Sequence, residues 1–205
     1  MNQAKQVGNR FDDRAEQYDN PLTAFIGERE LRAIRTLVQP HSEVLDYGCG
    51  TGRTTLDLLA RGCNVTAYDI SSEMLARAEV KAKQKGFVAQ FTADESALFG
   101  RRWPVVTCIG VLDYYIDPLP LLKALCEYLE PDGILVVTYP NGLSPLGWIY
   151  ALTSHFTVPS HVKSPRSVRQ AAAQVGLKIF SLKFAFPALA PIGHTLVVGM
   201  VSENR

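Results

Sequence analysis

The sequence predicts an α/β fold, a doubly wound and mostly parallel sheet with helices on both faces. Short apolar runs alternate with helical segments along most of the 205 residues, and such runs are typical of strands in a parallel sheet that is covered on both sides. The first run leads into a glycine-rich turn at 48–52, and Asp69 closes the second run. The length and the 47% hydrophobic content suit a single domain over 1–205.

The individual elements follow from the spacing of apolar residues and from residues that begin or end helices. Near-helical spacing of apolar residues predicts a leading helix over 22–38. Ser71 and Gly86 bound the helix after the second strand, because serine caps helix N-termini and glycine ends helices. Pro118 opens a helix over 118–128. The other elements expected are strands at 43–46, 63–68, 88–92, 105–109, 134–139, 177–186 and 195–201 and helices at 52–61 and 164–175.

Two segments lie outside this alternation. Leading helices are expected over about 10–38, before the first strand. Residues at about 140–165 form an insertion after the fifth strand, and large apolar residues are frequent over 143–156. The insertion predicts either an amphipathic helix with one unpartnered apolar face or an additional core helix.

The charge balance excludes a broad electrostatic attraction to nucleic acid, because 21 Lys and Arg face 20 Asp and Glu. No acid occurs over 133–202, a stretch that contains five basic residues. This asymmetry indicates either ordinary solvated faces or a surface for an anionic substrate or an acidic membrane. The four cysteines lack CxxC and disulfide spacing, and no apolar run is long enough for a signal peptide or a spanning helix. We therefore expect a cytoplasmic protein without a metal site.

The glycine turn at 48–52 lets the backbone bend sharply and lets a ligand lie against it. Arg53 occupies the place of the third glycine in the dinucleotide fingerprint GxGxxG. Asp46, at the end of the first strand, would repel a pyrophosphate but favour the ammonium of a nucleoside that carries an amino acid. Asp69 is placed to accept hydrogen bonds from both ribose hydroxyls. A nicotinamide oxidoreductase is therefore a disfavoured alternative.

Short motifs accompany the later strands. The segment 93–95 reads ADE after the third strand, 109–111 reads IGV after the fourth, and 129–133 reads LEPDG before the fifth. With the glycine turn, these motifs resemble those of the class I S-adenosylmethionine-dependent methyltransferases of small molecules, and the resemblance covers most of the chain. FDDRAEQYD at 11–19 resembles the start of many such members, in which the tyrosine, here Tyr18, caps the methyl-transfer channel. Packing of the leading helix is the alternative for this tyrosine.

The resemblance implies S-adenosylmethionine as the cofactor and a seven-stranded sheet whose last strand is antiparallel. It implies that Asp69 and Ile70 form the ribose-binding loop and that Met74 packs near adenine. It also implies that Asp94 bonds the adenine amino group, with help from the backbone of Glu95. The cofactor-binding residues expected in all are Tyr18, Asp46, Gly48, Cys49, Gly50, Gly52, Asp69, Ile70, Met74, Asp94, Glu95, Ile109 and Gly110.

A catalytic base is needed only if the acceptor is a phenol or an alcohol, because alignment of the acceptor with the sulfonium methyl supplies much of the catalysis. The candidate catalytic residues are Asp113, Tyr115 and His161. Relatives often show VLEH where this chain has VLDY, so Tyr114 replaces the usual histidine. Helix capping for Asp113 and a structural role for His161 are the alternatives.

The insertion resembles the substrate lid of this family, which favours a small apolar or anionic-amphipathic acceptor that is methylated at oxygen. Carboxylate methylation is one form of this hypothesis, since Lys163 and Arg166 could hold the acid and no base would be needed. Peripheral membrane contact through 143–156 is a further expectation. Motifs of nucleic-acid methyltransferases are absent. The altered segment at 113–115 keeps open a non-catalytic relative that acts through a partner.

Overall fold

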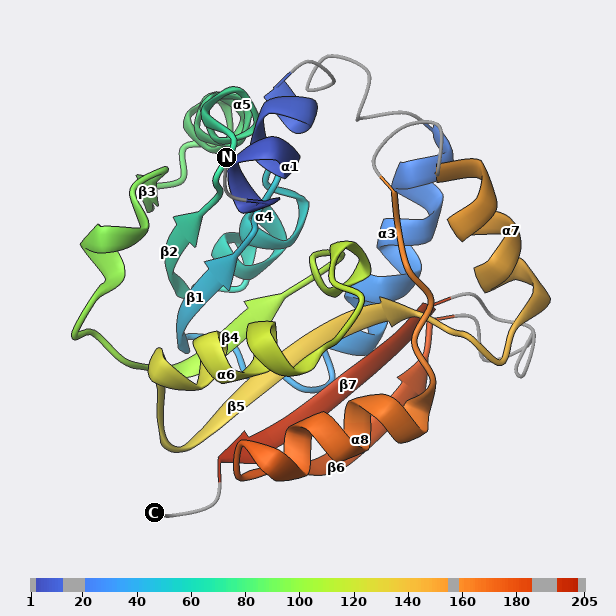
Figure 1. Cartoon of the computed structure of the whole chain (residues 1–205). Helices are drawn as coiled ribbons and strands as arrows, with labels where there is room; N and C mark the ends of the chain where they lie inside the picture. The colour runs from blue at the N-terminus through green and yellow to red at the C-terminus, as the bar shows by residue number, and fades with distance from the viewer. Residues whose placement is uncertain (1–2, 13–20, 155–158, 186–194, 203–205) are drawn as a thin grey trace.

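The computed structural model describes residues 3–12, 21–154, 159–185 and 195–202. Seven strands form one twisted sheet in the order β3-β2-β1-β4-β5-β7-β6 (Figure 1). Strands β1 to β5 pair in parallel, and β7 pairs antiparallel to both β5 and β6. This confirms the expected fold class and the antiparallel last strand. The strands are β1 Glu43–Tyr47, β2 Asn64–Tyr68, β3 Gln90–Thr92, β4 Trp103–Cys108, β5 Leu129–Pro140, β6 Leu177–Phe184 and β7 Thr195–Ser202.

Helices cover both faces of the sheet (Figure 1). One apolar cluster joins the sheet to the face that carries α6 and α8, and a second joins it to the face that carries α3 and α4. None of the helices in the described ranges has the length and apolarity needed to cross a bilayer. The helices are α1 Gln3–Asp12, α3 Pro21–Ile34, α4 Arg53–Ala60, α5 Ser72–Gln84, α6 Leu119–Glu127, α7 Pro145–Ser154 and α8 Pro165–Gln174, with the 3-10 turns η1 Glu95–Leu98 and η2 Leu112–Tyr114.

Helix boundaries that depend on local chemistry lie where the sequence places them. Ser71 caps α5, because its Oγ accepts a hydrogen bond from the Met74 amide at 3.1 Å. Ser164 caps α8 in the same way and accepts from the Ser167 amide at 3.0 Å. The leading helix expected to reach residue 38 ends earlier, at Ile34, and the chain continues in turns.

Strand β5 begins five residues earlier than expected, at Leu129 instead of residue 134. Leu129 pairs with Trp103 and Ile134 pairs with Val105, so five steps along β5 match only two along β4. The LEPDG segment is therefore an irregular part of the strand, and not a turn before it. Asp132 within it has a φ of 60°.

The topology places the candidate site at one edge of the sheet. Strand β1 lies between β2 and β4, and these three parallel strands end at the same edge. Chain direction therefore brings the residues after β1, β2, β3 and β4 together, at the switch point where ligands bind in doubly wound sheets. The insertion follows β5, and α7 lies within it (Figure 1).

Candidate active site

The glycine turn after β1 holds three residues with positive φ, at 75° for Gly48, 54° for Gly50 and 86° for Gly52. A Cβ on Gly48 would lie 2.3 Å from Val111, and a Cβ on Gly52 would lie 2.8 Å from Ala78. At Gly50, a Cβ would have no heavy atom within 4 Å. The outer two glycines therefore serve close packing, whereas Gly50 faces open space.

Gly110, after β4, provides a second open position. A Cβ there would also have nothing within 4 Å. The Gly110 amide donates a hydrogen bond to the Thr138 hydroxyl at 2.8 Å, which fixes the loop to the end of β5. Gly50 and Gly110 thus leave room for a ligand beside the ends of two neighbouring strands, where the cofactor is expected.

Asp69 joins the glycine turn to the end of β2. One carboxylate oxygen accepts from the Gly50 amide at 2.7 Å, and the other accepts from the Ser71 amide at 2.9 Å. Burial raises the pKa of Asp69 to about 6, although these two backbone hydrogen bonds lower it. Each carboxylate oxygen retains a lone pair, so the side chain can still accept from ribose hydroxyls. Its ribose-binding role stays a prediction.

Asp46 has a different environment from the one expected. Its carboxylate is 1% exposed and accepts hydrogen bonds from the Thr55 hydroxyl at 2.6 Å and the Thr107 hydroxyl at 2.8 Å. Burial raises its pKa, and the two hydroxyls oppose this shift. Through these two hydrogen bonds, the Asp46 side chain connects β1 to α4 and to β4. An effect on a bound ammonium would act through space, and this role stays a prediction.

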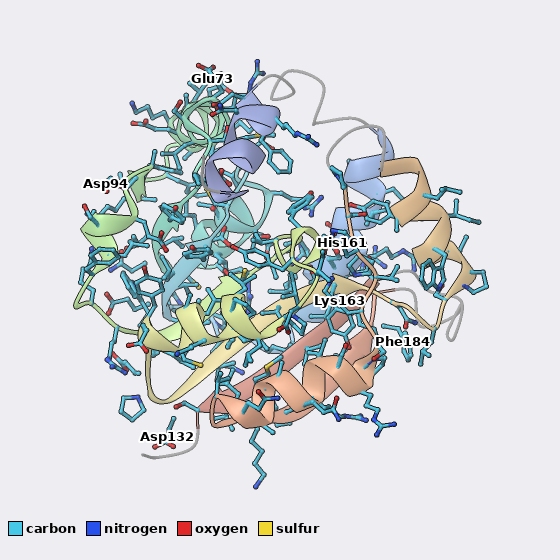
Figure 2. The ribbon with its side chains drawn as sticks, viewed as in Figure 1. Glu73, Asp94, Asp132, His161, Lys163 and Phe184 are labelled. Atoms are coloured by element: carbon cyan, nitrogen blue, oxygen red, sulfur yellow. The ribbon has the colours of Figure 1, made fainter. Side chains whose placement is uncertain are left out.

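The residues expected around adenine lie along the ends of β2 and β3. Met74 is fully buried, whereas Ile70 is partly exposed and packs against Gly8 of α1. Asp94 is exposed beside β3 and caps η1, accepting from the Ser96 amide at 2.9 Å (Figure 2). Contact with adenine by these residues stays a prediction.

The other predicted cofactor residues also lie at this edge. Cys49 is buried, and its amide donates to the Tyr68 carbonyl at 2.9 Å. Glu95 accepts hydrogen bonds from two tyrosine hydroxyls, and Ile109 is half-buried before Gly110. Tyr18 lies outside the described residues.

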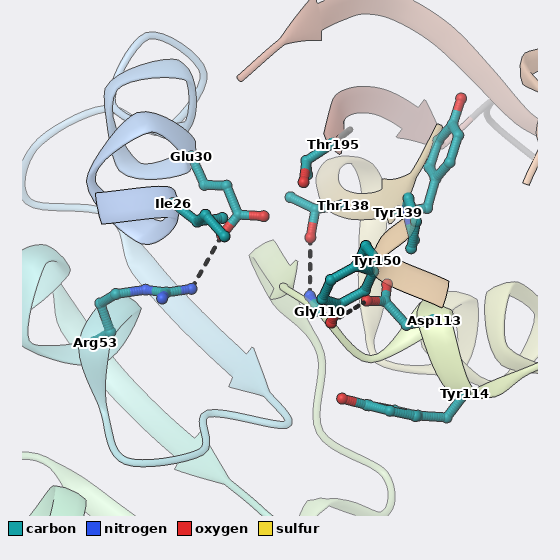
Figure 3. Close-up of a pocket in the computed structure, with 11 residues that line it drawn as sticks. Ile26, Glu30, Arg53, Gly110, Asp113, Tyr114, Thr138, Tyr139, Tyr150 and Thr195 are labelled. Atoms are coloured by element: carbon teal, nitrogen blue, oxygen red, sulfur yellow. Dashed lines mark hydrogen bonds and ion pairs between the residues drawn. The ribbon is translucent and has the colours of Figure 1, made fainter. Parts of the chain in front are cut away.

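A cavity of about 80 Å³ lies beside Gly110, between α3, α7 and the ends of β4, β5 and β7 (Figure 3). Its volume suits one functional group of an acceptor and not a whole ligand. Carboxylate, guanidinium, hydroxyl and aromatic groups all face it. It is lined by Ile26, Glu30, Arg53, Gly110, Asp113, Tyr114, Thr138, Tyr139, Pro140, Tyr150 and Thr195.

Asp113 is the predicted catalytic residue that reaches this cavity. It is 6% exposed, and its Oδ1 has no hydrogen-bond partner among the described residues. The Tyr150 hydroxyl approaches Oδ2 at 3.5 Å, a long contact. Burial, and to a smaller extent the charge of Glu30, raises the pKa of Asp113 to about 7, and the charge of Lys163 opposes both effects. A carboxylate in this state can take up a proton near neutral pH.

Glu30 of α3 is a cavity residue that sequence reasoning missed. It is buried, and its Oε2 lies 3.0 Å from Arg53 Nη2 in an ion pair that joins α3 to the first turn of α4. Burial raises the pKa of Glu30 to about 7, and Arg53 opposes the shift. One signal was present in the sequence: Glu30 shares a helix face with Ile26 and Ile34, so a carboxylate interrupts an apolar stripe.

The other two catalytic candidates do not contribute side chains to the cavity. Tyr115 packs against the apolar cluster under α6. His161 lies on the α7 side of the site (Figure 2), where its amide donates to the Asp113 carbonyl at 2.7 Å. The histidine therefore adjoins Asp113 through the backbone, and its side chain is not part of the lining.

Lys163 and Arg166 are not arranged to grip a carboxylate together. Lys163 is 3% exposed, and its Nζ donates to the His161 carbonyl at 2.7 Å. Burial lowers its pKa to about 8, while the charge of Asp113 raises it. Arg166 is exposed on α8, and neither residue lines the cavity. The lysine instead serves as a buried counter-charge for Asp113.

Helix α7 forms one wall of the cavity through Tyr150. The helix lies within the insertion at 140–165, and a lid function for this insertion stays a prediction. Its other large apolar side chains point outward and leave an exposed apolar face. They are Leu146, Trp148, Ile149 and Leu152, together with Leu143 just before the helix.

The strand order, the glycine turn after β1 and the acid after β2 together define the class I methyltransferase fold and its cofactor edge. The chain matches the family described as "Methyltransferase domain" over residues 14–182, and it belongs to this family. Membership in this family argues against the alternative that the protein is a nicotinamide oxidoreductase.

Curated relatives match a part of the chain. A ubiquinone biosynthesis O-methyltransferase of Actinobacillus pleuropneumoniae is 31% identical over 107 residues, which are 48% of this chain and 46% of the relative. The corresponding protein of Xanthomonas campestris is 29% identical over 139 residues, 66% of this chain and 58% of the relative. The chain thus spans about half the length of the curated relatives it matches.

Solved structures match nearly the whole fold. The magnesium protoporphyrin IX methyltransferase of Synechocystis PCC 6803, determined with bound S-adenosylhomocysteine, has a TM-score of 0.76 and 18% identity. The match covers 98% of this chain and 100% of that structure. A methyltransferase of Clostridium acetobutylicum has a TM-score of 0.69 at 15% identity, covering 95% and 99% of the two chains. At these identities the likeness concerns the fold alone.

Proposed function

We propose that this protein transfers a methyl group from S-adenosylmethionine to an oxygen of a small, mainly apolar acceptor, with Asp113 as the base. The observation that carries the proposal is the position of Asp113. Its buried carboxylate has an unpartnered oxygen and lines the cavity beside Gly110, next to the edge where the cofactor is expected. Family membership supports the methyl transfer itself.

Bound S-adenosylmethionine would supply a methyl group on a sulfonium, which needs no further activation. Asp113 would accept the proton of the acceptor hydroxyl while the oxygen bonds the methyl carbon and the sulfur leaves as a thioether. The carboxylate has a pKa of about 7, so it is a stronger base than an ordinary aspartate and still largely ionised slightly above neutral pH. The Tyr150 hydroxyl lies 3.5 Å from this carboxylate, and the charge of the buried Lys163 favours its ionised form.

Oxygen as the methylated atom draws support from the curated relatives, which are named O-methyltransferases of ubiquinone biosynthesis. An apolar acceptor draws support from the cavity wall, where Ile26, Tyr114 and Tyr139 surround the polar groups. The exposed apolar face of α7 adjoins the same wall. A mainly apolar acceptor with one polar reacting group would suit both the cavity and the apolar face of α7.

The direct test is incubation with S-adenosylmethionine labelled in its methyl group and a cell extract that contains lipids and polar metabolites. Mass spectrometry of the labelled species should identify an O-methylated product, and Asp113→Asn should reduce its formation by about 10²- to 10⁴-fold. A labelled product methylated at nitrogen or carbon would contradict the proposal. So would an Asp113→Asn variant with undiminished turnover.

A non-catalytic relative that acts through a partner is the competing function. It predicts tight binding of S-adenosylmethionine in calorimetry and no labelled product from any extract. If folded protein binds neither S-adenosylmethionine nor S-adenosylhomocysteine, both functions are wrong.

A further inference from the structure

Glu95, the first residue of η1, is held by two tyrosines from different elements. The Tyr47 hydroxyl donates to Glu95 Oε1 at 2.8 Å, and the Tyr128 hydroxyl donates to the same oxygen at 3.1 Å. Tyr47 is the last residue of β1, and Tyr128 follows α6. Two long-range hydrogen bonds therefore attach a short surface turn to the core of the sheet.

The two phenols are themselves rigidly supported. The Tyr47 ring lies 4.8 Å from the Tyr68 ring and 6.0 Å from the Tyr128 ring, measured between centroids. Trp103 contacts Tyr128 edge-on at 6.3 Å. Burial raises the pKa of Tyr47 and also that of Tyr128, the latter to about 12. Both phenols therefore keep their protons, and a hydrogen bond to an ionised acceptor is roughly twice as strong as a neutral one.

The turn that this arrangement fixes lies beside the ribose-binding edge. Tyr47, Tyr68 and Thr92 are paired in register across the ends of β1, β2 and β3. The Asp69 amide continues the ladder by donating to the Thr92 carbonyl at 3.4 Å. Asp94 follows two residues after Thr92, exposed at the edge of the sheet (Figure 2). Asp94 thus lies at the same edge of the sheet as Asp69, one strand further along.

We propose that Tyr47 and Tyr128 are positioning residues for the base of the cofactor, because through Glu95 they hold η1 where Asp94 meets the adenine amino group. This inference rests on the proposed use of S-adenosylmethionine. The hydrogen bonds of Asp94 itself are local: its carboxylate accepts from the Ser96 amide, and its amide donates to the Thr92 hydroxyl at 3.1 Å, two residues earlier at the end of β3. The hydrogen bonds from Tyr47 and Tyr128 to Glu95 add long-range contacts, to β1 and to the end of α6, that fix the turn relative to the rest of the sheet.

The test is calorimetry with S-adenosylhomocysteine and with S-inosylhomocysteine, in which an oxygen replaces the adenine amino group. A site that bonds the amino group discriminates against the analogue that lacks it. We expect wild-type protein to prefer the adenine compound, and we expect Tyr47→Phe with Tyr128→Phe to weaken its binding by about tenfold, because two hydrogen bonds to a charged acceptor are lost. The preference between the two compounds should fall at the same time.

Tyr68→Phe is the matched control. It removes a hydroxyl from the same aromatic cluster, but no hydrogen bond to Glu95, and should keep both the affinity and the preference. The single variants Tyr47→Phe and Tyr128→Phe provide the same readout, with smaller effects, if the double variant does not fold. Asp94→Asn should abolish the preference for S-adenosylhomocysteine over S-inosylhomocysteine even though both tyrosines are present.

Failure of the two proposals can be told apart. Absence of S-adenosylhomocysteine binding by folded wild-type protein would overturn the proposed function together with this inference. Normal binding by the wild type, with a preference that both phenylalanine variants retain, would overturn the inference alone. Loss of affinity for both compounds in equal proportion would also contradict it, because that pattern indicates a general structural defect.

Discussion

Replacing Asp113 with asparagine should change how stability depends on pH, and the effect can be worked out from its burial. An aspartate whose pKa rises from 3.8 to about 7 on folding binds its proton more tightly in the native state. Native stability is therefore full below pH 4 and falls as the pH rises toward and through 7. For one such group, the free energy of unfolding falls by about 3 kcal/mol between pH 5 and pH 8. Asparagine does not titrate, so the variant avoids this loss.

Urea unfolding at pH 5, 6, 7 and 8 measures the effect. The free energy of unfolding of Asp113→Asn, minus that of the wild type, should rise by about 3 kcal/mol across this range and level off above pH 8. Tyr150→Phe is the control, because it removes the 3.5 Å contact and leaves the titrating carboxylate in place. A difference between Asp113→Asn and wild type that does not vary with pH would refute the reasoning.

Further predictions concern the cofactor edge and the cavity. Asp69→Ala should weaken S-adenosylhomocysteine binding in calorimetry more than Asp113→Ala does; the reverse order would mean that the ribose does not lie at Asp69. Thr107→Val should lower the free energy of unfolding by about 1–3 kcal/mol, because it removes a hydrogen bond to the buried Asp46 carboxylate, and an unchanged urea midpoint would argue against that bond. Glu30→Gln should move the acidic limb of the pH–rate profile to lower pH, since the charge of Glu30 raises the pKa of Asp113; an unmoved limb would show that the two carboxylates are not coupled.

Those parts of the fold that depend on neighbouring residues could be predicted from the sequence. Ser71 and Ser164 begin helices because their hydroxyls cap amides three residues ahead. The glycine turn and Asp69 could be assigned together because strand direction brings the ends of β1 and β2 to one edge. The early start of β5 at Leu129 could not, because its irregular pairing with β4 is a property of the sheet.

The candidate site also divides into residues that could be selected from the local sequence and residues whose surroundings come from distant parts of the chain. Asp113 could be selected from its place after the fourth strand, and it does reach the cavity. Glu30 was visible in the sequence only as a carboxylate on an apolar helix face, because its partner Arg53 is 23 residues away on another helix. The hydroxyls that enclose Asp46 come from Thr55 and Thr107, on two further elements, so the burial of this carboxylate is visible only after folding.

The absence of a side chain at Gly27 leaves room for the guanidinium of Arg53, which lines the cavity. A Cβ at this position would lie 2.1 Å from Nη1 of Arg53, so a larger residue would force the guanidinium to move. Among the residues that line the cavity, Glu30 and Asp113 are acids and Arg53 is the base that pairs with Glu30. Displacement of the guanidinium would break its ion pair with Glu30 and remove the charge that lowers the pKa of that carboxylate. The missing side chain on α3 thus lets a positive charge stay beside the buried Glu30 carboxylate.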